Sequence, residues 1–280
     1  MNVKDILRRG VRYIIMGVPK ITVNISVGQI DNEQLLKGKN ILITGGGSGI
    51  GFAIAQKCIN SGANVIITGR NEEKLVLAVE TLGDRSSYIK QDVSDINSIP
   101  QTINSAKVMS VSGDIDVLVC NAGVSFHEEN IEHVNKEAFE KQFAINLEGA
   151  YFLAQEFVMK RNDKKEYTIL FVSSERGFQC DDVPYGLSKA SINSLVRGLS
   201  RRYYMKGIRV NGIAPGITLS EMTASTVSSD NFYAERLASK RYFRPEEVAE
   251  VAAFLISDAS KCVSGEIVAC DAGEYISSYF

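Results

Sequence analysis

Tyr185 and Lys189 are four residues apart in a segment whose pattern predicts a helix, so both side chains leave the same face of that helix. A phenol ordinarily has a pKa of about 10, and a nearby ammonium group favours the phenolate, which makes Tyr185 a usable acid or base closer to neutral pH. The chain contains 11 tyrosines, so this spacing alone could arise by chance. Its position gives it weight, because Ser173 and Ser174 end the preceding predicted strand and bring a hydroxyl group to the same rim.

A glycine-rich loop, Thr-Gly-Gly-Gly-Ser-Gly-Ile-Gly at residues 44–51, lies between an apolar strand at Asn40–Ile43 and a helix that begins near Ile50. Glycines at such a junction allow a sharp turn, a close approach of the backbone to a pyrophosphate, and tight packing of the helix on the sheet. The N-terminus of the helix then offers free N–H groups and the positive end of its dipole to the anion. An ordinary glycine-rich turn is the alternative for this loop taken alone.

The second predicted strand ends in Thr68-Gly69-Arg70-Asn71, with no acidic residue to bind a ribose 2′-hydroxyl. Arg70 could instead receive a 2′-phosphate, which favours NADP(H) while NAD(H) remains an alternative. Asp92 and Val93 follow the third strand, where a carboxylate could accept from the adenine amino group and a backbone N–H could donate to the ring. A solvated arginine and an aspartate that caps a turn are the plainer alternatives.

Composition limits the classes of function. The chain has 280 residues, 45% of them hydrophobic and 23% charged, which fits one large globular α/β domain. A net charge of −2 argues against a protein that binds nucleic acid by bulk electrostatics. Its five cysteines have no CxxC spacing, which indicates a reducing cytoplasmic setting without disulfides or a metal site.

Predicted strands and helices alternate along the chain, and this favours a three-layer α/β/α, doubly wound parallel sheet of the Rossmann type with about seven strands. Ligands of such sheets bind at the carboxyl ends of the strands, where the glycine-rich loop already lies. Besides Asn40–Ile43, the predicted strands are Asn64–Thr68, Ser87–Lys90, Ile115–Cys120, Tyr167–Ser173, Arg209–Ile213 and Glu266–Cys270. The predicted helices after the first are Glu72–Leu82, Ile96–Val108, a long one over Phe139–Met159, Val183–Tyr204 and Pro245–Ile256.

Residues 1–38 fall outside this alternation and are interpreted as an N-terminal arm, with residues 39–280 as the dinucleotide-binding and catalytic domain. Met1–Arg12 could form a basic amphipathic helix, and Ile21–Val27 alternates like a half-buried strand. The arm could pack on the domain or on a partner subunit, or it could contact a membrane surface or act as a lid.

A substrate loop is predicted at residues 218–244. Its last part, Lys240-Arg241-Tyr242-Phe243-Arg244, could be an ordinary solvated charge run or could bind an anionic carbonyl substrate.

Several motifs occur in the order typical of one family and cover about residues 38 to 275: Thr44-Gly45-x-x-x-Gly49-x-Gly51, Cys120-Asn121-Ala122-Gly123, Asn146, Ser174, Tyr185-x-x-x-Lys189 and Asn211-x-x-x-Pro215-Gly216. The chain resembles the short-chain dehydrogenase/reductase family in its compact single-domain branch, with a general similarity to 3-oxoacyl carrier protein reductases. It departs from the family pattern at Cys120, often an asparagine, at Asp271-Ala272-Gly273, and in a slightly short segment between Ser174 and Tyr185. The short segment bears on the substrate and not on the type of reaction.

The resemblance implies reversible hydride transfer between a nicotinamide and a carbonyl or secondary alcohol, with Tyr185 exchanging the proton. Lys189 would lower the pKa of Tyr185 and hold the nicotinamide ribose, Ser174 would hold the substrate oxygen, and Asn146 would support a water relay. Register with Gly177 selects Ser174 over Ser173. The residues expected to hold the cofactor are Thr44, Gly45, Gly47, Ser48, Gly49, Ile50, Gly51, Arg70, Asn71, Asp92, Val93, Asn121, Ala122, Gly123, Tyr185, Lys189, Pro215, Gly216 and Ile217.

The resemblance also implies a homo-oligomer, a tetramer, with the helices at Phe139–Met159 and Val183–Tyr204 at one interface. Two other functions are weighed against ketone reduction. One is a dinucleotide-binding protein without turnover, and the other is a sugar-nucleotide epimerase or dehydratase, a branch that resembles Gly-x-x-Gly-x-x-Gly in its loop.

Overall fold

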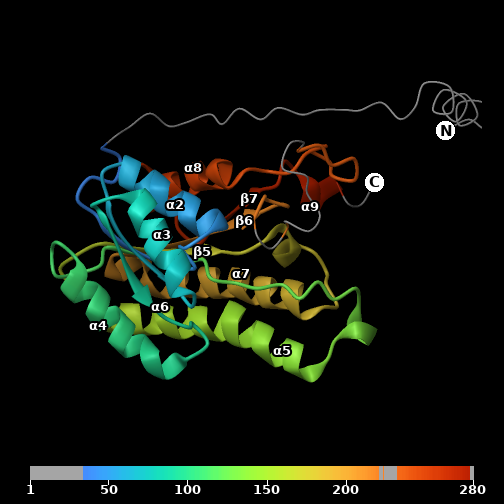
Figure 1. Cartoon of the computed structure of the whole chain (residues 1–280), viewed down its shortest axis with the longest axis horizontal. Coiled ribbons are helices and arrows are strands. Elements are labelled where there is room, and N and C mark those ends of the chain that lie inside the picture. Colours follow the sequence, from blue (N-terminus) through green and yellow to red (C-terminus); the bar gives the residue numbers. More distant parts are fainter. Residues whose placement is uncertain (1–33, 221–222, 224–231, 278–280) are drawn as a thin grey trace, which may run out of the picture.

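The computed structural model describes residues 34–220, 223 and 232–277 (Figure 1). The helix predicted at Met1–Arg12 and the strand predicted at Ile21–Val27 therefore lie outside the described residues. So does most of the first half of the predicted substrate loop.

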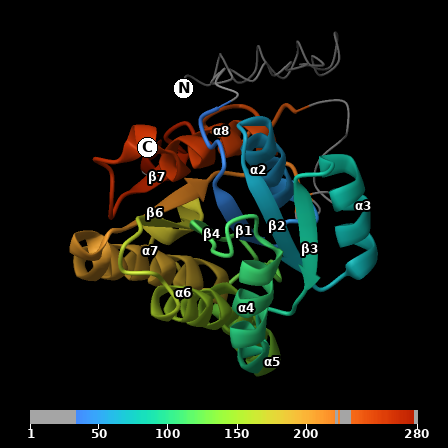
Figure 2. The same cartoon turned by 90° about the vertical axis from the view of Figure 1, so that its left-hand side faces the viewer.

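The described residues form a parallel sheet of seven strands in the order β3-β2-β1-β4-β5-β6-β7 (Figures 1 and 2). This confirms the predicted fold class. The order changes direction at β1, where Ile41 pairs with Val65 of β2 on one side and with Val117 of β4 on the other. The carboxyl ends of β1 and β4 therefore diverge into loops that leave a crevice between them. The strands are β1 (Asn40–Thr44), β2 (Asn64–Gly69), β3 (Ser86–Lys90), β4 (Val117–Cys120), β5 (Tyr167–Val172), β6 (Ile208–Pro215) and β7 (Ile267–Cys270).

Helices cover both faces of the sheet because alternate side chains of each strand point to opposite faces. Ile41 and Ile43 belong to one core cluster, whereas Leu42 between them belongs to the other. The first cluster is closed by α2 (Gly49–Asn60), α3 (Glu72–Leu82) and α8 (Pro245–Ile256), and the second by α4 (Ile99–Met109), α6 (Gly149–Met159) and α7 (Pro184–Tyr203). The remaining helices are α5 (Lys136–Phe143) and the short α9 (Glu274–Ser277).

The helix predicted over Phe139–Met159 is interrupted. A π-helical segment at Ala144–Glu148 separates α5 from α6. Gly149 follows this segment and packs so closely on the loop after β3 that a Cβ atom there would lie 2.4 Å from the carbonyl oxygen of Val93. The wider turn places Asn146 toward the loop after β4, and such single π turns often occur at functional sites.

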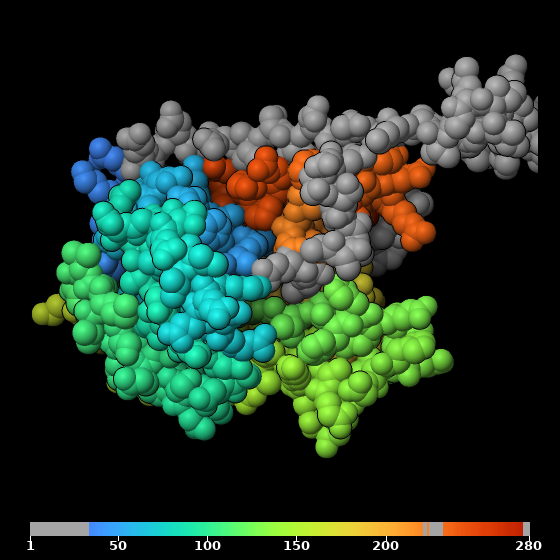
Figure 3. Space-filling model, in the orientation of Figure 1, coloured from blue at the N-terminus to red at the C-terminus, as the bar shows by residue number. Residues whose placement is uncertain are grey.

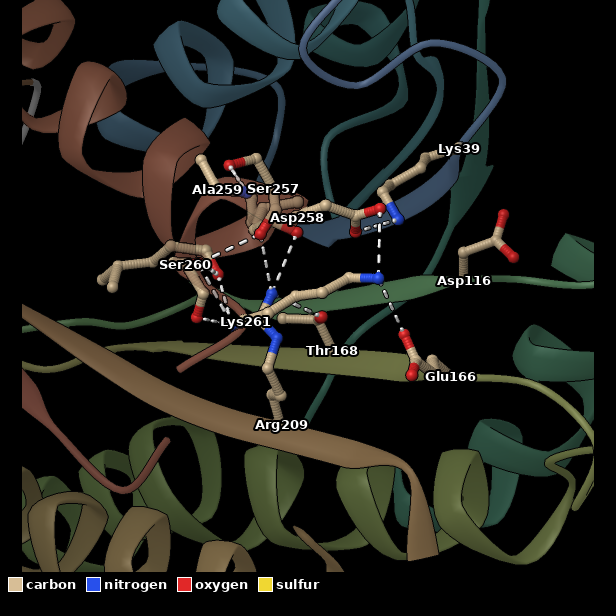
Figure 4. A network of polar contacts seen from close by, with 12 residues as sticks. Lys39, Asp116, Glu166, Thr168, Arg209, Ser257, Asp258, Ala259, Ser260 and Lys261 are labelled. Carbon is tan, nitrogen blue, oxygen red and sulfur yellow. Dashed lines mark hydrogen bonds and ion pairs between the residues drawn. The ribbon is translucent and has the colours of Figure 1, made fainter. Parts of the chain in front are cut away.

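At the amino ends of the strands, a polar network surrounds Arg209, which lies at the start of β6 (Figure 4). Its guanidinium group donates to the carbonyl oxygens of Leu255 and Ser257 at the end of α8, and to those of Ser260 and Val263 beyond it. These bonds satisfy carbonyl groups that a helix end leaves without partners. Arg209 thereby fixes the end of α8 to the sheet at the amino ends of the strands, whereas the glycine-rich loop lies at their carboxyl ends.

Candidate active site

A cavity of about 680 Å³ lies at the carboxyl ends of the strands. Loops that follow β1 to β6 line it, so residues far apart in the sequence meet there. The space-filling view shows the surface hollowed between the cyan residues around β3 and the green segment that follows β4 (Figure 3). Of the residues predicted for the site, all except Thr44 and Asn146 line this cavity.

The glycine-rich loop has the geometry that an anion requires. Gly45 and Gly49 have φ angles of +66° and +55°, which side chains other than hydrogen disfavour. A Cβ atom on Gly51 would lie 2.3 Å from the carbonyl oxygen of Gly45. Ser48, the N-cap residue of α2, makes no side-chain capping bond among the described residues, and the first turn of α2 has no acidic residue. The first turn of α2 lines the cavity, so the N–H groups that the start of a helix leaves free suit a pyrophosphate.

Thr44 has a different place from the predicted one. It is only 1% exposed, and its Oγ1 accepts the backbone N–H groups of Asn121 and Ala122 at 3.0 and 3.1 Å. Asn121 in turn donates its side-chain amide to the carbonyl oxygens of Thr44 and Gly45. Thr44 therefore joins the loops after β1 and β4 and does not contact the cavity, which its position inside the motif alone could not show.

The end of the cavity near β2 and β3 carries Arg70, Asn71 and Asp92. The side chain of Asn71 caps α3 by accepting the backbone N–H of Lys74 at 3.0 Å, which leaves Asn71 a structural role as well. Oδ1 of Asp92 accepts from the backbone and the hydroxyl of Ser94. Burial alone would raise the pKa of Asp92, but the Ser94 bonds, with Arg70 nearby, lower it. Asp92 thus stays ionised beside a cation.

The catalytic end of the cavity holds Ser174, Tyr185 and Lys189. Tyr185 and Lys189 lie one turn apart near the start of α7, and the Nζ atom of Lys189 is 5.7 Å from the centre of the Tyr185 ring. Lys189 donates to the carbonyl oxygen of Val172 at 3.0 Å, which ties α7 to the end of β5. The Ser174 side chain is close enough to the Tyr185 phenol to act on its pKa, which it lowers. A hydroxyl pair and a buried ammonium group therefore converge at one point of the cavity.

The two serines at the end of β5 have different surroundings. Ser173 donates to Oδ1 of Asn193 at 2.7 Å and to the carbonyl oxygen of Lys189 at 3.2 Å, so its hydroxyl is committed to the packing of α7. Ser174 also lines the cavity and is the serine that acts on the pKa of Tyr185. That Ser174 and not Ser173 holds the substrate oxygen stays a prediction.

Asn146 lies behind the cavity wall and is 2% exposed. Its amide both accepts from and donates to the backbone of Val124, at 2.8 and 2.9 Å, and also donates to the hydroxyl of Ser188. Ser188 in turn donates to the carbonyl oxygen of Tyr185. These bonds connect the loop after β4 with the first turn of α7, so Asn146 joins the two elements behind the cavity wall, and its part in a water relay stays a prediction.

Burial sets the pKa values of the two ionisable groups. It lowers the pKa of Lys189 to about 8. It also raises the pKa of Tyr185, and the charge of Glu175 adds to this, although the Ser174 side chain acts in the opposite direction. Loss of solvation therefore outweighs the neighbouring groups at Tyr185, and the lowering effect of Lys189 on its pKa stays a prediction.

A family model described as enoyl-(acyl carrier protein) reductase matches residues 45–274. The 3-oxoacyl-[acyl-carrier-protein] reductase FabG of Rickettsia felis is 32% identical over 241 residues, which cover 85% of this chain and 97% of that protein. The oxidoreductase UcpA of Salmonella typhimurium is 34% identical over 252 residues, which cover 85% and 95%. The chain belongs to the short-chain dehydrogenase/reductase family.

Solved structures of this family have the same fold. A 3-ketoacyl-(acyl-carrier-protein) reductase from Brucella melitensis, complexed with NADH, is 26% identical with a TM-score of 0.79 and covers 86% of this chain and 99% of its own. A putative gluconate 5-dehydrogenase from Beutenbergia cavernae with bound NADP is 28% identical with a TM-score of 0.77 and covers 88% and 100%. This short-chain dehydrogenase/reductase is therefore an NAD(P)-dependent oxidoreductase.

Two cations of the predicted substrate loop lie elsewhere. Arg241 forms a two-pronged ion pair with Glu247, at 2.8 and 2.7 Å, and Arg244 pairs with Glu246. Both acidic residues belong to the first turn of α8, so these arginines fix the loop to that helix. Neither arginine lines the cavity formed by the described residues, so this cluster gives no support for an anionic substrate.

Residues that the sequence analysis missed complete the wall. Glu175 and Arg176, directly after Ser174, line the cavity, as do Gln91 and Lys74 near β3 and α3. Only the position of Glu175 and Arg176 beside Ser174 could have marked them in advance. Among the described residues, no group of three or more potential ligands could hold a metal ion, and no helix is long and apolar enough to cross a membrane.

Proposed function

We propose that this enzyme reduces a ketone with NADPH, reversibly, and that Ser174, Tyr185 and Lys189 carry out the reaction. The observation that supports this most directly is the meeting of the three side chains at one end of a cavity whose other end carries Arg70 and Asp92, with the glycine-rich loop between the two ends. A dinucleotide held between these ends would place its nicotinamide against Pro215, Gly216 and Ile217.

A bound nicotinamide would supply the hydride. The residues of this chain hold the substrate oxygen and exchange the proton. The substrate oxygen is held between the hydroxyl groups of Ser174 and Tyr185, and Tyr185 gives it a proton in reduction and takes one in oxidation. Lys189 places a positive charge near the phenol, and its bond to Val172 keeps it there. The positioning contacts of Asn146 keep α7 and the loop after β4 in register.

The preference for NADPH rests on Arg70. It follows β2 at the rim of the cavity, where the 2′-position of the adenosine ribose is expected, and Lys74 lines the same region. Arg70→Ala is expected to weaken NADPH binding by about 10-fold or more and NADH binding much less, because only NADPH loses a charge-assisted bond. Equal losses for the two cofactors, measured by fluorescence titration, would make Arg70 an ordinary surface residue.

The catalytic assignment is tested by Tyr185→Phe, which removes one hydroxyl group. We expect kcat to fall by about 100-fold or more while the Kd for NADPH changes little. Tyr88→Phe is the matched control, since Tyr88 lies on the edge strand β3 and does not line the cavity that the described residues form. Near-normal kcat in Tyr185→Phe would refute the assignment. NADPH binding without turnover of any carbonyl compound would instead support a dinucleotide-binding protein.

We also propose a homo-oligomer, a tetramer, in which α6 and α7 form an interface. Tyr151 and Leu187, in the first turns of α6 and α7, are 44% and 40% exposed, and exposed apolar side chains on neighbouring elements suit an interface. A cytoplasmic location remains part of this proposal and is supported by five cysteines that are all free thiols.

A further inference from the structure

Glu175 is a buried carboxyl group in the wall of the cavity, immediately after Ser174. It begins a short 3₁₀ turn at Glu175–Phe178 and is 8% exposed. Its Oε2 atom has no hydrogen-bond partner among the described residues. Unpartnered buried carboxyl oxygens are rare because they lose their bonds to water without replacement.

The carboxyl group lies at the end of the cavity where the reaction is proposed to occur. A Cβ atom on Gly216 would be 3.0 Å from Oε2 of Glu175, so the two residues are in contact. Gly216 is one of the residues expected to pack on the nicotinamide. On the other side, Glu175 is close enough to Tyr185 for its charge to raise the pKa of that phenol.

Among the described residues, no ion pair joins a cation to Glu175. Arg176 pairs with Asp181 at 2.6 and 2.5 Å. The charges on other elements that act on the pKa of Glu175 are acidic. Asp271 is buried and accepts two backbone N–H groups, and Glu274 accepts the backbone N–H of Ala238. Glu175 thus faces acidic neighbours on other elements, which disfavours a carboxylate or phosphate in direct contact with it.

We propose that Glu175 binds a hydroxyl group on the substrate carbon next to the reacting carbonyl. The substrate is then an α-hydroxyketone in reduction and a vicinal diol in oxidation. This inference rests on the proposed function, because it places the reacting carbonyl at Ser174 and Tyr185. Glu175 directly follows Ser174, which holds the carbonyl oxygen. The part of the substrate that meets Glu175 is therefore expected to be a substituent on the carbon next to the carbonyl.

A hydroxyl group suits this carboxyl better than other donors. Burial, with the charges of Asp271 and Glu274, raises the pKa of Glu175 to about 7, against a smaller opposing effect of Arg176. The group is thus present in both protonation states near neutral pH. A hydroxyl group can donate to the carboxylate or accept from the carboxylic acid, whereas an ammonium group can only donate. The last torsion of a glutamate side chain is soft, so a rotation of the carboxyl group alone brings either oxygen toward the cavity.

The test compares 3-hydroxy-2-butanone with 2-butanone, which differ in one hydroxyl group. We expect the wild type to favour the hydroxyketone in kcat/KM by about 100-fold with NADPH, since a site built around a buried polar group discriminates strongly against an analogue that leaves it unpaired. Glu175→Met has a similar length and no hydrogen-bonding group, and the ratio should fall to about 10 or less. Glu175→Gln keeps a donor and an acceptor and should retain most of the preference. Glu80→Gln on the exposed face of α3 is the matched control.

An equilibrium measurement separates this inference from the proposed function. Calorimetric titration of 2,3-butanediol and of 2-butanol into the NADP⁺-saturated Tyr185→Phe protein measures binding without turnover. Tighter binding of the diol that is lost in Tyr185→Phe with Glu175→Met supports the inference even where no ketone is reduced, in which case only the proposed reaction fails. Equal binding of the two alcohols, a kcat/KM ratio that Glu175→Met leaves unchanged, or preference for 3-amino-2-butanone over the hydroxyketone would overturn it.

Discussion

Glu175→Gln should change how the stability of the protein depends on pH, and this can be predicted without any assumption about the reaction. The substitution keeps the size of the side chain and removes its ability to ionise. In the folded protein, burial and the nearby charges of Asp271 and Glu274 raise the pKa of Glu175 from 4.5 to about 7, with Arg176 opposing them. Tyr185 is a further ionisable group near Glu175.

The sign and size follow from the proton balance. Below pH 4.5 the carboxyl group is protonated in both the folded and the unfolded chain. Between pH 4.5 and 7 the unfolded chain releases this proton while the folded chain keeps it, so the free energy of unfolding of the wild type falls as the pH rises. A pKa difference of about 2.5 corresponds to about 3 kcal/mol, and the loss is complete above pH 7. Glu175→Gln lacks this loss.

The measurement is urea unfolding followed by circular dichroism from pH 4.5 to pH 8, at one protein concentration for wild type, Glu175→Gln and the exposed control Glu80→Gln. The difference between Glu175→Gln and wild type should move by about 3 kcal/mol in favour of the variant across this range, or about 5 °C in Tm. Because only the change of this difference with pH is used, any pH-independent effect of the amide on the free energy of unfolding cancels. Curves for Glu175→Gln and wild type that stay parallel within about 0.5 kcal/mol would refute the burial argument, and a shift in Glu80→Gln of the same size would assign the effect to general charge.

Three further predictions concern the framework. Gly51→Ala should weaken NADPH binding by about 10-fold or more in a fluorescence titration, because its Cβ would lie 2.3 Å from the carbonyl oxygen of Gly45; unchanged binding would mean that the loop relaxes freely. Arg209→Met should lower the free energy of unfolding by about 3 kcal/mol and leave NADPH affinity unaltered, because it strips bonds from the end of α8 at the amino ends of the strands; a loss below about 1 kcal/mol in urea unfolding would contradict this. Light scattering at micromolar concentration should give the mass of a tetramer, and a monomer mass would exclude the interface proposed for α6 and α7.

Most of the fold could be predicted because its signals are local. Continuous apolar runs such as Val117–Cys120 mark strands that are covered on both faces, and proline marks the start of α8. Helices α3 and α8 have the predicted bounds, Glu72–Leu82 and Pro245–Ile256. The π turn at Ala144–Glu148 could not be predicted, because it depends on contacts of Gly149 and Asn146 with loops far away in the sequence.

The site shows the same division between local and distant causes. The spacing of Tyr185 and Lys189 follows from helix geometry, so the sequence alone places them on one face. Arg241 could pair either with an acidic residue of the chain, such as Glu247, or with an anionic substrate. The sequence does not distinguish these two partners. The structure pairs Arg241 with Glu247.

Gly216 and Glu175 show the difference between a residue that a family motif predicts and one that only the folded structure brings to the cavity. Gly216 lies in a motif shared with the family, and the sequence predicts its place at the nicotinamide. The same position is where a Cβ atom would meet Glu175, Asp271 and Phe243 at about 3.0 Å, so the close packing of an acidic side chain depends on the glycine. A bulkier residue at either position would separate the carboxyl group from the reacting end of the cavity. The chain therefore combines a framework that its motifs predict with a carboxyl group that only the folded structure brings against it.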